Sequence, residues 1–242
     1  MKKKFLLPIL LCNLLIVLGI ANLANASVIL DQNFDLETTG STPSNWLVTN
    51  PAFGGLAIDD TVYYGTSGKS AKFTDTSASG YPLPYSLFSP QSGVSLNVEF
   101  ALMKNNIAGV DDGAFMFYVD DGNYNGGNVY LKLFQEGIYY YDGATHLIGN
   151  YNYDTWYKFN LNIDIPNNSY DIYRDGNLLV ADAPFRGSTT YLNRVSFGGS
   201  TAGIATGYLD DLRITAIPEP ASMSLLGLGL LGLFGIKRRK SA

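Results

Sequence analysis

Positions 94–102 read VSLNVEFAL, and apolar residues occupy every second place. Successive side chains of a β-strand point to opposite faces of the sheet, so this pattern predicts a strand with one buried and one polar face. Positions 156–165 read WYKFNLNIDI and repeat the alternation, with Phe159, Leu161 and Ile163 on the apolar side. Both segments are therefore predicted to be strands that cover a hydrophobic core.

Strand-like segments continue on both sides of these two. Gly113–Val119 and Val129–Phe134 are apolar at nearly every place, which predicts inner strands whose second face is lined with aromatic residues. Asp-Gly pairs, the favoured residues of tight hairpin turns, separate such segments at 121–122, 142–143 and 175–176. About 11–14 strands at short spacing are expected, which favours an antiparallel β-sandwich. The fold class predicted for residues 27–216 is thus all-β, in one domain.

The first 26 residues have the three parts of a secretion signal. Three lysines follow Met1, an apolar stretch runs from Phe5 to Ile20, and Ala24 and Ala26 form a small-residue cleavage site. We predict a signal helix that signal peptidase removes after Ala26. A membrane anchor is the alternative, which the short apolar stretch disfavours. Cys12 is the only cysteine and lies inside this segment, so the mature chain is predicted to have no disulfide.

A second address segment occupies residues 217–242. Pro218, Glu219 and Pro220 come first, residues 221–236 carry no charge, and Lys237-Arg238-Arg239-Lys240 follows. These three parts resemble the PEP-CTERM sorting signal of Gram-negative bacteria. The resemblance implies processing by an exosortase near Pro-Glu-Pro, in bacteria that make exopolysaccharide and often form biofilm. An ordinary single-span tail is the alternative, and its topology before processing would be the same.

The two ends together predict the location of the protein. The hydrophobic helix expected at 221–236 is marginally long enough for a bilayer of about 30 Å, and its basic end would stay in the cytoplasm. We therefore expect an exported protein of the cell envelope, outer surface or extracellular matrix, anchored transiently in the inner membrane.

The charge of the domain limits its partners. Residues 27–217 contain nine basic and twenty acidic residues, which gives a net charge of −11. Nucleic acid and anionic lipid are poor partners for such a surface. A neutral polysaccharide, or an acidic one bridged by Ca²⁺, is compatible with it.

Six short motifs follow one another over residues 28–215. They are Asn33-Phe34-Asp35, Asn45-Trp46, Ser67-Gly68-Lys69-Ser70-Ala71, Trp156-Tyr157, the hairpin 169–176 and Tyr208-Leu209-Asp210-Asp211-Leu212. Their order resembles the concanavalin-A/laminin-G-like jelly rolls of secreted bacterial proteins. The resemblance implies a jelly-roll β-sandwich and a carbohydrate-facing or adhesive module, sometimes related to glycan-active enzymes.

The resemblance also implies one structural Ca²⁺ between the first and last strands. The matching residues are Asp35 and Asp211, and Asp31 would join them if those strands pair. Calcium prefers six to eight oxygen ligands, which carboxylates and carbonyls supply. Capped turns facing water are the alternative.

Catalytic residues are scarce in the sequence. His146 is the only histidine and lies beside a predicted turn, and the three glutamates of the domain, Glu37, Glu99 and Glu136, form no cluster. The adjacent aspartates at 59–60, 111–112 and 120–121 are predicted to cap turns. We therefore expect no enzyme, although a lyase that uses tyrosine and lysine stays open because it leaves no spacing signature.

Aromatic side chains are the candidates for sugar binding, because sugar rings stack on aromatic faces. The predicted ligand-binding residues are Tyr139, Tyr141, Tyr151, Tyr153 and Trp156. Tyr139 and Tyr141 share one face of their strand, and Tyr140 takes the other. Core packing is the alternative for each of these residues. Trp46 is predicted to pack inside.

The sequence thus favours a non-catalytic, surface-sorted module that associates with exopolysaccharide or biofilm matrix. A structural matrix protein without a specific ligand, and an unusual lyase-like glycan-active enzyme, are the two alternatives. An exposed aromatic face would favour binding, and a polar flat surface would favour the structural role.

Overall fold

The computed structural model describes residues 26–106, 112–123, 128–201 and 203–217. The predicted signal segment up to Asn25, and the predicted sorting segment from Pro218 onward, lie outside the described residues. Within the described ranges, no helix has the length and apolar character needed to cross a membrane. Residues Ser27–Ala216 form one compact unit.

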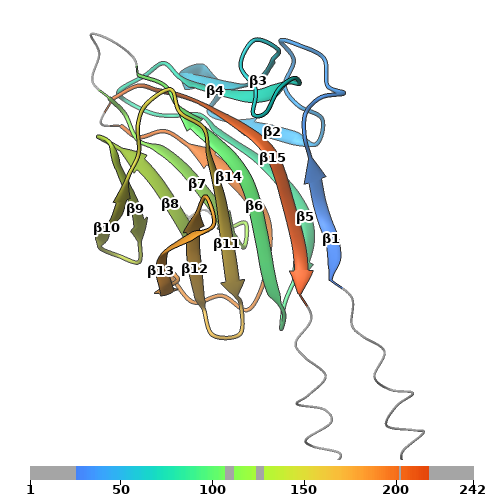
Figure 1. The fold of residues 1–242 in the computed structure, drawn as a ribbon, viewed down its shortest axis with the longest axis vertical. Helices are drawn as coiled ribbons and strands as arrows, with labels where there is room; N and C mark the ends of the chain where they lie inside the picture. The colour runs from blue at the N-terminus through green and yellow to red at the C-terminus, as the bar shows by residue number, and fades with distance from the viewer. Residues whose placement is uncertain (1–25, 107–111, 124–127, 202, 218–242) are drawn as a thin grey trace, which may run out of the picture. The chain divides into compact units, whose positions relative to one another are not determined.

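Sheet A has eight strands, and Figure 1 shows β1 and β15, at the two ends of the domain, side by side. Seven strands follow one another in the order β13 (Asn177–Pro184), β12 (Ser169–Arg174), β11 (Tyr157–Asp164), β6 (Ser95–Lys104), β15 (Ala205–Ile217), β4 (Ser70–Asp75) and β3 (Gly54–Asp59). The eighth, β1 (Ser27–Gln32), pairs with the second half of β15, and β4 pairs with the first half.

Sheet B has seven strands. Their order is β10 (Thr145–Asn150), β9 (Gly137–Tyr141), β8 (Val129–Phe134), β7 (Phe115–Asp120), β14 (Leu192–Gly198), β5 (Leu83–Gln91) and β2 (Trp46–Thr49). The only helical element in the described residues is the short 3₁₀ turn η1 (Pro51–Phe53). The chain passes repeatedly from one sheet to the other, so both sheets contribute to one core. The predicted antiparallel jelly-roll β-sandwich is confirmed, with fifteen described strands.

The alternating segments occupy the predicted places. Segment 94–102 forms most of β6, segment 156–165 forms β11, and the two strands pair directly. Asp175 and Gly176 connect β12 to β13 with φ values of 50° and 78°. Positive φ at both central residues is the geometry of the type I′ turn that suits a twisted hairpin.

Aromatic rings from both sheets meet in the core. Phe100 of β6 stacks on Phe117 of β7 with 4.0 Å between ring centroids, and Phe73 of β4 stacks on Phe115 of β7 at 5.2 Å. All six residues of β7 are buried, because the core covers one face and other side chains cover the second. Trp46 is 5% exposed and stacks on Phe197, so its predicted inward packing is confirmed.

Candidate functional site

The outer face of sheet B, which points away from the core, carries a row of tyrosines. Strand pairing aligns Tyr130 with Tyr118, Tyr118 with Ser196, and Ser196 with Tyr85. The ring of Tyr141 on β9 continues the line, 5.5 Å from that of Tyr130. We call Tyr85, Tyr118, Tyr130 and Tyr141 the tyrosine row. It crosses β9, β8, β7, β14 and β5 roughly at right angles, so it extends about 19 Å at about 4.8 Å per strand.

Two hydroxyls of the tyrosine row share one acceptor. Those of Tyr118 and Tyr130 both donate to the sulfur of Met116, and the two rings meet edge to face at 4.9 Å. Burial raises the pKa of Tyr130 to about 12. The Tyr130 hydroxyl is therefore suited to hydrogen bonding and poorly suited to act as a base near neutral pH.

A second row lies beside the first. Strand pairing places Tyr139 next to Lys132 and Lys132 next to Met116. The ring of Tyr139 lies over Gly137, where an added Cβ would come within 2.5 Å of it. Tyr118 covers Gly198 in the same way, with 3.0 Å to an added Cβ. The missing side chains of both glycines let the two rings lie close to the sheet.

A buried ion pair closes one end of this face. The Nε atom of Arg194 lies 2.6 Å from Oδ1 of Asp120, and their side chains are 9% and 2% exposed. Ser196 Oγ donates to the other carboxylate oxygen at 3.2 Å. The expectation that Asp120 caps a turn is thus only half right. Its Oδ1 accepts a hydrogen bond from the Gly122 amide, as a turn cap does. The carboxylate is also buried against Arg194 of β14, a partner that the sequence around Asp120 does not indicate.

Exposed leucines flank the tyrosine row. Leu47, Leu87 and Leu147 are 55%, 56% and 61% exposed. Strand pairing places them beside Tyr85, Arg194 and Tyr139 respectively. The outer face of sheet B therefore exposes aliphatic side chains beside partly buried tyrosines, an arrangement that is unusual for a surface that faces water. In the middle of the face, Tyr118 and Met116 are each only 6% exposed and belong to a small buried cluster.

The five predicted ligand-binding residues lie in three places. Tyr139 and Tyr141 are on the outer face of sheet B, and Tyr140 points the other way and packs against the core. Tyr151 is 3% exposed and belongs to the core, with the Tyr153 ring against it at 5.2 Å. Trp156 contacts Tyr64 and Tyr208 beside sheet A. The structure does not assemble these five residues into one platform.

Tyr151 and Tyr153 surround a buried lysine. The ammonium of Lys104 pairs with Asp112 and lies 5.0 Å from the Tyr153 ring centroid, while the Tyr153 hydroxyl donates to Asp112 at 2.8 Å. Burial raises the pKa of both tyrosines and lowers the pKa of Lys104. A tyrosine that acts as a lyase base would need a lowered pKa. The raised pKa values of Tyr151 and Tyr153 fit a structural role instead, in which the two rings and Asp112 hold the buried Lys104.

His146 has an equally local role. Its Nε2 lies 2.9 Å from Asp142 and its ring stacks on Tyr140 at 4.5 Å, both on the β9–β10 hairpin.

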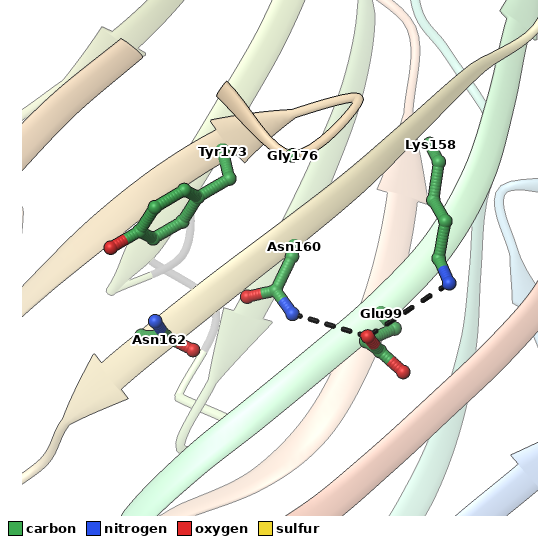
Figure 2. Close-up of a pocket in the computed structure, with 6 residues that line it drawn as sticks. All are labelled: Glu99, Lys158, Asn160, Asn162, Tyr173 and Gly176. Carbon is green, nitrogen blue, oxygen red and sulfur yellow. Dashed lines mark hydrogen bonds and ion pairs between the residues drawn. The ribbon is translucent and has the colours of Figure 1, made fainter. Parts of the chain in front are cut away.

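A polar pocket lies on the outer face of sheet A. It has a volume of about 280 Å³, and its lining residues are Glu99, Lys158, Asn160, Asn162, Tyr173 and Gly176. Figure 2 shows Asn160 and Lys158 both directed toward Glu99, at 3.3 Å and 3.9 Å from Oε1. These polar groups pair with one another, and Tyr173 is the single ring of the pocket. The tyrosine row, in which Tyr85, Tyr130 and Tyr141 are partly exposed and Tyr118 is buried between them, is therefore the stronger candidate for a binding site.

The residues predicted to hold calcium lie where β1 meets β15. Asp211 has a φ of 49° and separates the half of β15 that pairs with β4 from the half that pairs with β1. Burial, together with repulsion from Asp35 and Asp31, raises the pKa of Asp211. Asp210 accepts the amides of Tyr64 and Asp211, and burial raises its pKa to about 6.

The donor chemistry of this region suits a hard cation, because several carboxylates lie close enough to repel one another. In the part of the chain that the structure describes, however, no three carboxylate, histidine or cysteine side chains converge into a cage. Backbone carbonyls would have to supply further ligands for a calcium ion at Asp35 and Asp211.

Comparison with known proteins adds two findings. Residues 216–240 match the family model of the PEP-CTERM protein-sorting motif. The chain carries this sorting motif. The matched segment begins at Ala216, in the last two residues of β15. No curated protein sequence is detectably similar to the chain.

Solved structures share the fold. A sialidase aligns with a TM-score of 0.63 at 16% identity, over 78% of this chain but only 18% of its own. The cellulose induced protein Cip1 aligns with a TM-score of 0.55 at 14% identity, over 76% of this chain and 96% of its own. The lectin UEA-II, complexed with galactose, aligns with a TM-score of 0.50 at 13% identity, over 78% and 99%. At these identities the likeness establishes the jelly-roll fold.

Most of the candidate site was missed by the sequence reasoning. Tyr85, Tyr118, Tyr130 and Lys132 were not among the predicted binding residues. The prediction of aromatic second faces for 113–119 and 129–134 was the signal that pointed toward two of them, Tyr118 and Tyr130. Tyr85 has no such signal, because it joins the row only through pairing between β5 and β14.

Proposed function

We propose that this protein is an exported, exosortase-processed module that binds a glycan along the tyrosine row without cleaving it. The observation that carries this proposal is the alignment of four tyrosines across five strands of sheet B. Exopolysaccharide or biofilm matrix is the proposed setting, because the sorting motif implies delivery to the cell surface.

The shape and chemistry of the row support an extended ligand. Rings spaced along about 19 Å suit a chain of sugar units better than a single ring. Stacked aromatic contacts provide affinity, and hydroxyl groups at the ring edges provide hydrogen bonds that orient the ligand. The raised pKa of Tyr130 agrees with a binding role, since it keeps the hydroxyl neutral.

Replacing a tyrosine of the row is expected to weaken binding selectively. Tyr141→Ala removes one partly buried ring at the end of the row. We expect about tenfold weaker retention on exopolysaccharide from the producing organism, which corresponds to about 1.4 kcal/mol. The measurement is co-sedimentation with the purified domain, residues 27–216, which has its own core.

The matched control is Tyr173→Ala, which removes a partly buried tyrosine from the polar pocket of sheet A. Weaker retention of this control with unchanged retention of Tyr141→Ala would move the site to sheet A. Assaying the same tubes for new reducing ends tests catalysis. Sugar release would establish the enzyme alternative, and a domain that neither binds nor cleaves would be a structural matrix protein.

We also propose one structural Ca²⁺ at Asp35 and Asp211, with Asp31 as a further ligand. Calcium at one hundred times its dissociation constant would add about 2.7 kcal/mol to the free energy of unfolding. Calcium is therefore expected to raise the Tm of the domain, EDTA to reverse the rise, and Asp211→Asn to abolish it. Asp60→Asn, at an exposed site outside this region, is the control. If neither calcium nor EDTA changes the Tm, the calcium proposal is wrong, and Asp35 and Asp211 simply face water.

A further inference from the structure

Lys132 is an unusual residue for its position. It lies in the middle of β8, in the central part of sheet B, and its side chain is on the outer face between Met116 and Tyr139. Its Nζ lies 4.6 Å from the ring centroid of Phe134 and 5.9 Å from that of Tyr139. Among the described residues, no carboxylate lies within ion-pair distance of this ammonium group.

A partly buried cation without a counter-ion costs free energy. Burial strips water from the ammonium and lowers the pKa of Lys132. The faces of two aromatic rings return part of this cost through cation–π attraction. A bound anion would return more, because a charge-assisted hydrogen bond is about twice as strong as a neutral one.

The charge of the whole face points in the same direction. The domain as a whole has a net charge of −11. The outer face of sheet B differs, because the charged side chains that its described strands place there are Asp120, Lys132 and Arg194. Arg194 neutralises Asp120, so the charge that remains is that of Lys132. The guanidinium of Arg186, from the β13–β14 connection, lies 5.0 Å from the Tyr141 ring centroid. Lys132 is therefore the cation of this face that no carboxylate of the described residues balances, in a strongly acidic protein.

We propose that the tyrosine row selects a carboxylated glycan, with a uronate-type carboxylate of the chain paired to Lys132. This inference rests on the proposed glycan-binding function and adds the class of sugar. Charge complementarity commits the site to an anionic chain without a bridging metal.

The test compares chemically matched polysaccharides. Affinity electrophoresis of residues 27–216, with EDTA present, is run in polygalacturonate, alginate and hyaluronate and in the carboxyl-reduced form of each. We expect at least one acidic polymer to retard the domain about tenfold more strongly than its reduced form, with the difference shrinking as salt screens the charges.

Three variants identify the residue responsible. Lys132→Met keeps the length and apolar stem of the side chain, and it is expected to lose about tenfold in affinity for the acidic polymer only. Lys132→Arg keeps the charge and is expected to retain most of the affinity, which a purely packing role would not require. Lys158→Met removes one positive charge from the opposite face and is expected to change nothing. The Tm of each variant shows that the fold is intact.

The outcomes separate the two proposals. Equal retention by acidic and reduced polymers, or equal loss for Lys132→Met and Lys158→Met, overturns the carboxylate inference and leaves glycan binding intact. No retention by any of these polymers or by the native exopolysaccharide overturns the proposed function as well. A dimer that dissociates on Lys132→Glu would assign the face to a second copy of the chain and would also overturn the inference.

Discussion

Arg194→Met is expected to destabilise the domain by about 3–5 kcal/mol, because it leaves the carboxylate of Asp120 buried without its counter-ion. Burial alone already raises the pKa of Asp120, and Arg194 is the group that opposes this shift most strongly. Ser196 and the amide of Gly122 still donate to the carboxylate in the variant. Two neutral hydrogen bonds do not replace a full charge at 2% exposure.

Denaturant unfolding of residues 27–216 measures this effect. The matched control is Arg213→Met, whose ion pair with Asp31 is 3.9 Å long and has side chains 51% and 62% exposed. An exposed pair contributes about 0–1 kcal/mol. Adding Asp120→Asn to Arg194→Met is expected to recover most of the loss, since no buried charge then remains. Similar losses for Arg194→Met and Arg213→Met would show that the buried pair contributes no more than a surface one.

This ion pair also bears on ligand binding. The guanidinium of Arg194 lies 5.5 Å from the ring centroid of Tyr85, at one end of the tyrosine row. By neutralising Asp120, it removes a negative charge that would otherwise face an anionic ligand. Arg194 thus supports the site indirectly, through the stability and charge balance of the strand that carries Tyr118.

Local patterns in the sequence predicted the strands well. Alternation over 94–102 and 156–165 identified β6 and β11, because one face of each is buried and the other is polar. The Asp175-Gly176 turn identified the β12–β13 hairpin for a similarly local reason, since few residues accept positive φ at both turn positions.

The site depends on pairing between distant segments, which local patterns do not contain. Tyr85, Tyr118 and Tyr130 form one row only because the register of β5, β14, β7 and β8 aligns them. Asp120 reads as a turn residue before Asp121-Gly122, and its partner Arg194 is 74 residues away. Conversely, Tyr151 and Tyr153 are near Trp156 in sequence, but the chain directs them to different neighbours.

Asp75→Asn is expected to stabilise the domain at pH 7.5 and to leave it unchanged at pH 4. Asp75 is 1% exposed, and its Oδ2 atom has no hydrogen-bond partner among the described residues. Burial raises its pKa from 3.8 to about 6, against the opposing amides of Ser77 and Ser200. The folded state therefore holds this proton more tightly than the unfolded chain does.

The sign of the pH dependence follows from this difference in proton binding. Below pH 4 the carboxyl is protonated in both states, and its contribution to stability is fully present. As the pH rises from about 4 through 6, the unfolded chain loses the proton first, so the free energy of unfolding falls. A raised pKa of about two units corresponds to a loss of at most about 3 kcal/mol, and we expect about 2 kcal/mol.

Asparagine removes this penalty because it keeps an acceptor oxygen for the two amides and never carries the charge. The difference in unfolding free energy between Asp75→Asn and the parent domain should therefore grow between pH 4 and pH 7 and then stay constant. Asp60→Asn removes the same charge from an exposed site and is expected to show no such step. Equal free energies of unfolding for the parent and the variant above pH 6 would contradict this prediction, and would mean that the Asp75 carboxylate has a compensating partner in the folded state. The site leaves little room for such a partner, because a Cβ added at Gly199 would collide with Oδ2 of Asp75.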